Sequence, residues 1–131
     1  MQLLGKKALL AGGGQGIGRG IVDRFLEEGA RVAVVQRRPL DLELQRRSSV
    51  FCIQADLADA AALPAVVDHV VDQSGEVDIL VNNAGAMFER SVAEITPEEW
   101  DRMIALNLRA PLFLAQAVLP PSRHRQKRAT P

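Results

Sequence analysis

The chain has 131 residues, enough for one domain with a buried core, and its composition is typical of a soluble globular protein. Hydrophobic residues make up 47%, but no apolar run approaches the roughly 18 residues of a membrane span. The formal net charge is zero, although residues 122–131 hold four of the 16 basic residues and no acidic one. The preceding part carries 12 basic against 16 acidic residues, a net charge of −4, which gives no reason to expect nucleic-acid binding.

Residue types that form disulfides or bind metals are scarce. The one cysteine, Cys52, cannot form an internal disulfide and lies in an apolar run. We interpret it as a buried core thiol in a reducing compartment, and we expect a cytoplasmic protein. His69 lies on the polar face of a helical pattern beside Asp68 and Asp72, which favours a solvated side chain over a metal ligand. We predict no metal site.

The most informative stretch is the glycine-rich segment 11–18, which follows an apolar run and precedes an amphipathic segment. This order predicts a strand, a glycine turn and a helix. A helix N-terminus carries unpaired N–H groups and about half a positive charge, so it binds phosphate where no side chain blocks the approach. We expect Gly12 to permit the tight turn, Gly16 to let the backbone approach a pyrophosphate, and Gly18 to let the helix pack closely on the strand.

The spacing of these glycines excludes two common phosphate-binding motifs. The pattern G-x-G-x-x-G would need its last glycine at Ile17 or Arg19, and the P-loop would need lysine and a hydroxyl residue after Gly18. The pattern that fits is G-x-x-x-G-x-G, at Gly12, Gly16 and Gly18. A purely structural turn is the alternative interpretation, since glycine-rich turns are common.

Hydrophobic periodicity along the rest of the chain predicts alternating strands and helices. We expect strands at 8–10, 32–35, 50–53 and 77–81, helices at 16–28, 60–74 and 97–119, and a short helical segment within 39–47. The first helix has an apolar stripe with Ile17, Ile21 and Phe25, and Gly29 supplies its left-handed stop. This alternation indicates right-handed βαβ units and an open parallel sheet, hence an α/β fold.

The last predicted helix has a marked beginning and an interruption. Thr96 and Glu99 form a capping box with Pro97 at the first helical position, and Pro111 is expected to bend the helix.

Four segments, in their order and separation, resemble the classical short-chain dehydrogenase/reductase family over about residues 5–120. They are the glycine turn, Asp56-Leu57 after the third strand, Asn82-Asn83-Ala84-Gly85 after the fourth, and Asn107 in the following helix. One departure is Ala11, where the family usually has a threonine whose hydroxyl braces the turn.

The resemblance implies that residues 1–120 form part of a Rossmann-like NAD(P)-binding domain with strand order 3-2-1-4. Ligands then bind beyond the carboxyl ends of the strands, in the crevice between the first and fourth. Asp56 would accept a hydrogen bond from adenine, with helix capping as its alternative role, and Asn82 and Asn83 could serve only to satisfy a turn. The implied cofactor-binding residues are Gly12, Gln15, Gly16, Ile17, Gly18, Arg37, Asp56, Leu57, Asn83, Ala84 and Gly85.

The end of the second strand bears on the choice between NAD and NADP. An acidic residue there binds the ribose hydroxyls of NAD, whereas arginine accommodates the 2′-phosphate of NADP. This chain has Gln36-Arg37-Arg38, which favours NADP, with NAD as the alternative. The two arginines could also be solvated loop charges only.

The resemblance also implies chemistry that this sequence does not supply. The family transfers hydride between a nicotinamide and a carbonyl or alcohol, using a serine, a tyrosine and a lysine four residues later as well as an asparagine. The chain has no tyrosine, and Asn107 is the only member of this catalytic set that we identify. We therefore expect the cofactor-binding half of an oxidoreductase, inactive as given and acting on a small substrate only in a full-length form. The alternatives are a catalytically dead nucleotide-binding or regulatory module that docks with an intact relative, and a gene remnant.

The C-terminal residues change in character after the last helix. Residues 121–131 are basic, without periodicity, and we expect a disordered tail that reflects a premature end or out-of-register translation; a basic tail with its own purpose is the alternative. We expect the fourth strand to be an open edge and the helix around Asn107 to expose Leu112, Phe113 and Leu114. Open edges and exposed apolar faces promote association, so we predict self-association through this helix.

Overall fold

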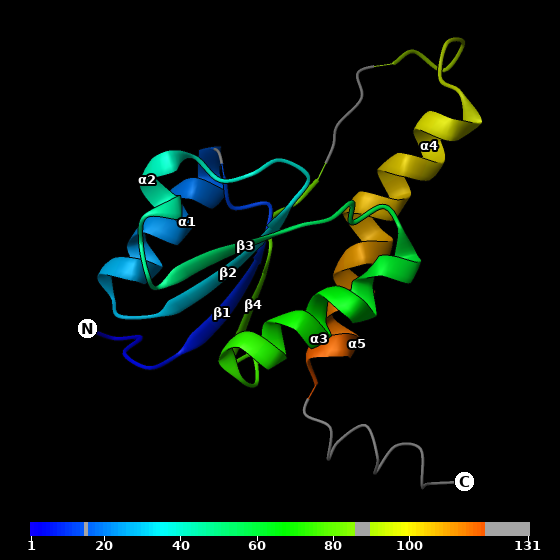
Figure 1. Ribbon diagram of the computed structural model, residues 1–131. Coiled ribbons are helices and arrows are strands. Elements are labelled where there is room, and N and C mark those ends of the chain that lie inside the picture. Colours follow the sequence, from blue (N-terminus) through cyan, green and yellow to red (C-terminus); the bar gives the residue numbers. More distant parts are fainter. Residues whose placement is uncertain (15, 86–89, 120–131) are drawn as a thin grey trace, which may run out of the picture.

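A four-stranded parallel sheet forms the centre of the computed structural model, which describes residues 1–14, 16–85 and 90–119. Its strands are β1 (Lys7–Ala11), β2 (Arg31–Gln36), β3 (Val50–Gln54) and β4 (Ile79–Asn82). They lie in the order β3-β2-β1-β4 (Figure 1), so the predicted strand order and parallel pairing are confirmed. Gln15 and the basic segment 121–131 lie outside the described residues.

Helices cover both faces of this sheet. They are α1 (Gly16–Glu27), α2 (Leu42–Gln45), α3 (Leu63–Ser74, after a 3-10 turn at Ala60–Ala62), α4 (Pro97–Ile104) and α5 (Ala110–Val118). Helices α1 and α2 lie against one face, and α3 and α5 lie against the other (Figure 1). The result is the expected α/β architecture of three layers.

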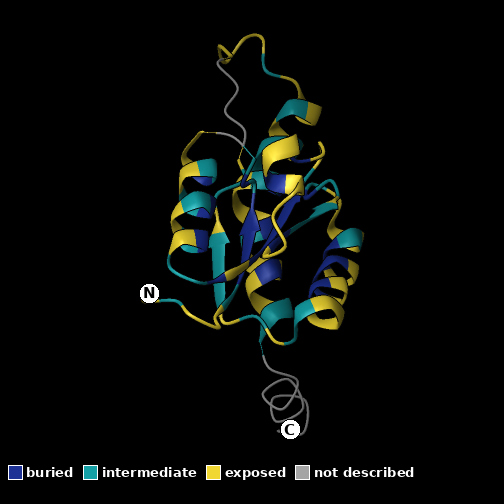
Figure 2. Cartoon of the chain, turned by 60° about the vertical axis from the view of Figure 1, so that its left-hand side comes forward, coloured by how far each residue is buried: buried dark blue, intermediate teal, exposed yellow. Residues whose placement is uncertain are grey.

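The alternation of side chains along the strands creates two apolar cores. Leu9 of β1 points toward α3 and α5, and its neighbour Leu10 points toward α1 and α2. Strand β2 is covered on both faces, so its central residues 32–35 are all buried, as the continuous apolar run predicts. Figure 2 shows this buried centre between helices whose outer sides are exposed.

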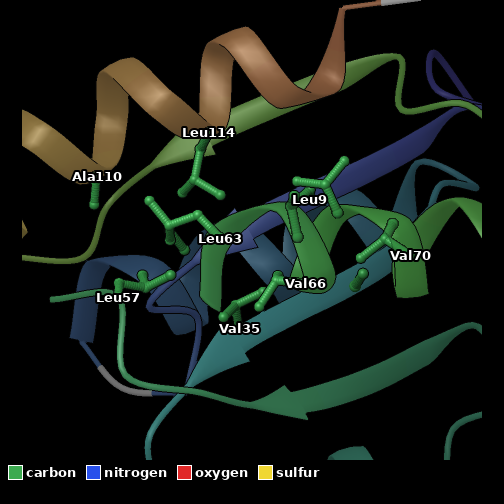
Figure 3. Close-up of a cluster of buried hydrophobic side chains, with 11 residues drawn as sticks. Leu9, Val35, Leu57, Leu63, Val66, Val70, Ala110 and Leu114 are labelled. Carbon is green, nitrogen blue, oxygen red and sulfur yellow. The ribbon is translucent and has the colours of Figure 1, made fainter. Parts of the chain in front are cut away.

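The apolar core on the α3 side contains side chains from the sheet, from α3 and from α5. Leu63 and Val66 of α3 share one cluster with Leu9 of β1 and with Leu114 of α5 (Figure 3). Leu114 is fully buried, so the expectation that it is exposed is wrong. It lies four residues after the buried Ala110 and therefore shares the inward face of α5. Burying each such side chain contributes about 1.5–3 kcal/mol.

Two residues predicted to be in the core lie nearer the surface. Ile17 is 80% exposed, because the buried row of α1 is Gly18, Val22 and Leu26. Ile17 directly precedes Gly18 in the first turn of the helix and lies outside that buried row. Cys52 is half-buried, and burial raises the pKa of its thiol.

The segment from Thr96 to Val118 begins as predicted but is not one regular helix. The Thr96 hydroxyl accepts a hydrogen bond from the Glu99 N–H at 3.1 Å, which confirms the capping box. Between α4 and α5 the backbone forms a π-helical turn at Ala105–Arg109. Pro111 is the second residue after this turn. It has no N–H, and its ring would press on the carbonyl of residue 107 in a regular helix, so the wider turn relieves that contact.

The turn between β1 and α1 is closely packed against neighbouring backbone. Gly12 has a φ of +81°, and its N–H donates to the Val35 carbonyl at 2.8 Å. The Gly12 carbonyl oxygen accepts a hydrogen bond from Asn83 Nδ2 at 2.6 Å. A Cβ on Gly18 would overlap that same oxygen and lie 2.5 Å from Asn83 Nδ2. The helix therefore approaches the strand as closely as the absence of a side chain at position 18 allows.

Gly18→Ala should destabilise the protein, and Gly20→Ala is its matched control. The new methyl at position 18 meets a backbone oxygen that cannot move alone, so we expect the free energy of unfolding to fall by about 1–3 kcal/mol. At Gly20, in the same helix, nothing lies within 4 Å of the Cβ position, so alanine should stabilise by about 0.5–1 kcal/mol. Urea unfolding measures both. Equal stability of the two variants would contradict the close packing at Gly18.

Candidate functional site

A cavity of about 630 Å³ opens at the carboxyl ends of the strands, in the size range of small-molecule sites. Six residues predicted from the sequence line it, namely Gly12, Arg37, Asp56, Leu57, Ala84 and Gly85. Gln36 and Arg38, which the sequence places beside Arg37 at the end of the second strand, line it as well. Five further lining residues were not predicted, namely Gly14, Val35, Ala55, Arg102 and Leu106. The cavity thus lies at the carboxyl ends of the strands, near the point where the strand order reverses, which is where a ligand is expected in an open parallel sheet.

The remaining predicted residues surround the glycine turn. Gly16 is the first residue of α1, with a φ of +56° and no heavy atom within 4 Å of its Cβ position, so the space in front of it is open. Gly18 packs against Gly12 behind it. Ile17 is exposed at the start of the helix. Gln15 lies outside the described residues, so the structure does not place it.

Asn83 joins the end of β4 to the glycine turn. Its backbone N–H donates to the Ala11 carbonyl at 3.1 Å, and its side chain donates to the Gly12 carbonyl. The side chain thus has the structural role that the sequence left open. The next residue, Ala84, touches the other side of the same turn, because a Cβ on Gly12 would lie 2.9 Å from its Cα.

Asn107 lies across from the end of this segment. It is exposed on the π-helical turn, and its Nδ2 donates to the Met103 carbonyl at 2.9 Å. Its Oδ1 faces Gly85, where a Cβ would lie only 2.6 Å away. The fold thus brings together two of the predicted segments, residues 83–85 and Asn107.

Asp56 is held by two partners. Its Oδ1 accepts from the Ala58 N–H at 3.0 Å, and Arg102 of α4 donates to both carboxylate oxygens, at 3.2 and 3.4 Å. Partial burial alone would raise the pKa of Asp56, but the hydrogen bonds from Arg102 and Ala58, with the charges of Arg102 and Arg37, lower it overall. The carboxylate is therefore ionised at neutral pH.

Arg102 had no local signal in the sequence. It lies 46 residues from Asp56 in the sequence, and only the folded chain brings α4 close to Asp56. Gln36 ends β2 and lines the cavity. The prediction from the sequence uses only its lack of charge, but a polar residue at the carboxyl end of a parallel strand is itself a signal for a position beside the ligand site.

Arg37 and Arg38 present positive charge to the cavity. Both are exposed, and within the part of the chain that the structure describes neither makes an ion pair. Arg19 and Arg102, by contrast, are bound to carboxylates. The charges of Arg37 and Arg38 are therefore open to an anion in the cavity.

Metal-binding clusters and membrane-spanning helices are both absent from residues 1–14, 16–85 and 90–119. No group of three or more His, Cys, Asp or Glu side chains in these ranges could hold a metal ion. No helix in them combines the length and the apolar character needed to cross a membrane.

Known proteins share this sequence and arrangement. A family model described as short chain dehydrogenase matches residues 6–129. The sorbitol dehydrogenase of Cereibacter sphaeroides is 38% identical over 124 residues, which cover 90% of this chain and 47% of that enzyme. A blue fluorescent protein from a metagenomic library, solved with NADPH, is 34% identical with a TM-score of 0.79, over 90% of this chain and 51% of its own. The 3-ketoacyl-(acyl-carrier-protein) reductase of Brucella melitensis, solved with NADH, is 31% identical with a TM-score of 0.82, over 96% and 53%.

These matches confirm the Rossmann-like architecture. The chain spans about half the length of the curated relatives it matches, 47% in the case of the sorbitol dehydrogenase. Because the family model covers most of its length, this chain belongs to the short-chain dehydrogenase/reductase family.

Proposed function

We propose that this chain binds a nicotinamide dinucleotide, with NADP preferred over NAD, as the cofactor-binding half of a short-chain oxidoreductase. The observation that carries the proposal is the cavity, bordered by the glycine turn and the Ala84-Gly85 segment and supplied with two unpaired arginines. Solved relatives with NADPH and with NADH support the class of ligand. The preference for NADP rests on Arg37 and Arg38.

The pyrophosphate would bind at the N-terminus of α1. The first N–H groups of a helix have no intrahelical partner and attract anions. The open space at Gly16 lets a phosphate approach them, and a side chain at that position would stand in its path. Packing of Gly18 on Gly12 fixes the start of the helix beside the cavity.

The adenine would lie toward Asp56. A carboxylate accepts about four hydrogen bonds, and Asp56 receives three, so one position remains for the adenine amino group. Arg102 lowers the pKa of this carboxylate and holds it in place. The turn at Ala58 and the adenine contact are then compatible roles for one side chain.

Hydride transfer between the nicotinamide and a small carbonyl or alcohol is the activity we propose for a full-length protein. The cofactor would supply the hydride, and a protein residue would move the proton. The 131 residues contain no tyrosine for that step. We propose that the chain as given binds the cofactor without turning over a substrate, with Asn107 as its one contribution to the catalytic set.

An exposed apolar surface favours a second property, which is association. Leu108 and Leu112 are each 64% exposed and Phe113 is 40% exposed, and all three lie on the segment that includes Asn107. We propose that this surface joins two copies of the chain. Docking on an intact relative, in which the chain acts as a catalytically dead module, would use the same surface.

The wild-type chain should bind 2′-phospho-AMP about tenfold more tightly than AMP, since a charge-assisted contact adds about 1.5 kcal/mol. Isothermal titration calorimetry measures both dissociation constants. Arg37→Met should remove most of the difference, whereas Arg46→Met, which replaces an exposed arginine at the C-terminal end of α2 outside the cavity lining, should not. Equal affinity of the wild-type chain for the two nucleotides would remove the argument for NADP.

No turnover is expected from the purified chain with NADPH and assorted aldehydes and ketones, because it lacks a tyrosine as proton donor. The measurement is the loss of NADPH absorbance, made on a sample whose NADPH binding has been shown by fluorescence. Reproducible oxidation of NADPH that depends on the carbonyl compound would contradict the proposal.

Leu112→Lys should shift the chain toward monomer in sedimentation velocity, because a charge in the exposed apolar surface opposes its burial. Val92 is 97% exposed and lies apart from this surface, before α4, so Val92→Lys is the matched control and should leave association unchanged. A wild-type chain that is monomeric at all concentrations would contradict the proposed association.

A further inference from the structure

The loop that carries Arg37 and Arg38 is held by side-chain amides along its whole length. We call residues 37–40, which connect β2 to α2, the arginine loop. Its four carbonyls accept hydrogen bonds from three glutamines on three elements: Arg37 O from Gln54 at 3.3 Å, Arg38 O and Pro39 O from Gln36 at 2.8 and 3.4 Å, and Leu40 O from Gln45. The Cys52 thiol also donates to Arg38 O, at 3.9 Å.

This arrangement fixes the backbone while leaving the charges available. Three of the four loop residues are exposed, and exposed loops are ordinarily mobile. Here the carbonyls are tied to β2, β3 and α2, so the loop is ordered before a ligand arrives. Ordering a loop on binding weakens affinity, and a loop ordered during folding avoids that cost.

Gln36 links this loop to the glycine turn. Its amino group faces two carbonyls, which need a donor, and this fixes the orientation of the amide. The same amide packs on Gly14, where a Cβ would overlap its Oε1 and lie 2.7 Å from its Nε2. One side chain therefore contacts both the turn expected to hold the pyrophosphate and the loop with the two arginines.

We propose that Gln36 is a positioning residue that sets the preference for a 2′-phosphate by holding the Arg38 and Pro39 carbonyls. The inference rests on the proposed function, because it concerns how the same cavity takes a 2′-phosphorylated nucleotide. Gln36 acts through the arginine loop and need not touch the phosphate. Its removal should weaken binding of 2′-phosphorylated ligands more than binding of their unphosphorylated counterparts.

Two variants disturb Gln36 in independent ways. Gln36→Met keeps the length of the side chain and removes both donated hydrogen bonds. Gly14→Ala leaves Gln36 in the sequence but displaces its amide, and alanine is tolerated there because the backbone at Gly14 is outside the left-handed region and the crowded group is the flexible end of a side chain. Gln73→Met, on the exposed face of α3, is the matched control.

The experiment measures, for the full 131-residue chain, the ratio of the dissociation constants of AMP and 2′-phospho-AMP. We expect Gln36→Met to lower this ratio about fivefold, the effect of one or two neutral hydrogen bonds. Gly14→Ala should lower it in the same direction, and the double variant should lower it no further than the larger single effect, because both act on one contact. Gln73→Met should leave the ratio unchanged.

The measurements distinguish a wrong NADP preference from a wrong role for Gln36. If the wild-type chain binds both nucleotides equally, the NADP preference is wrong and this inference falls with it. If the wild-type chain prefers 2′-phospho-AMP and Gln36→Met keeps that preference, this inference alone is overturned. An equal loss of affinity for both nucleotides in Gln36→Met overturns it too, since Gln36 would then support the fold and not the selectivity. Circular dichroism of each variant verifies that the folded state is compared.

Discussion

The carbonyl oxygen of Gly12 is the atom on which the site most depends. It accepts a hydrogen bond from the Asn83 side chain, and it lies where a Cβ on Gly18 would be. One oxygen thus sets the distance between the ends of β1 and β4 and the first turn of α1. Because the interior is closely packed, a side chain added at Gly18 would displace the backbone around Gly12. The direction in which the unpaired N–H groups of α1 point, and the wall that residues 84–85 give to the cavity, both follow from this contact.

The opposite side of the cavity is organised by polar contacts between distant segments. Arg102 holds Asp56 from α4, and the glutamines hold the arginine loop from β2, β3 and α2. Partly exposed ion pairs contribute little to stability, so the Asp56–Arg102 pair is better understood as fixing geometry. Backbone packing therefore shapes the end of the cavity at the glycine turn, and side-chain hydrogen bonds shape the end formed by Asp56 and the arginine loop.

The parts of this structure that local pattern determines could be predicted from the sequence. Strand alternation, the capping box at Thr96 and the glycine spacing each depend on residues close together in the chain, and the strand order followed from the resemblance to a family. The errors concern residues whose burial depends on a distant partner. Ile17 fits a helical stripe yet is exposed, and Leu114 is buried in the cluster with α3 although its helix has an apolar outer surface as well. Arg102 has no periodic or motif signal at all, because its role depends on a residue 46 positions away.

The π-helical turn at Ala105–Arg109 has a consequence for how this segment tolerates change. Relative to a regular helix it accommodates an additional residue, and each residue rotates a helix by about 100°. With that residue in place, Arg102 before the turn and Leu114 after it both face the body of the protein. Deleting one residue from the turn would restore a regular α-helix. Either Arg102 or Leu114 would then face away from the body of the protein. The π-helical turn thus allows one continuous helical segment to place Arg102 at the cavity and Leu114 in the apolar core, two positions that a regular helix would not direct to the same side.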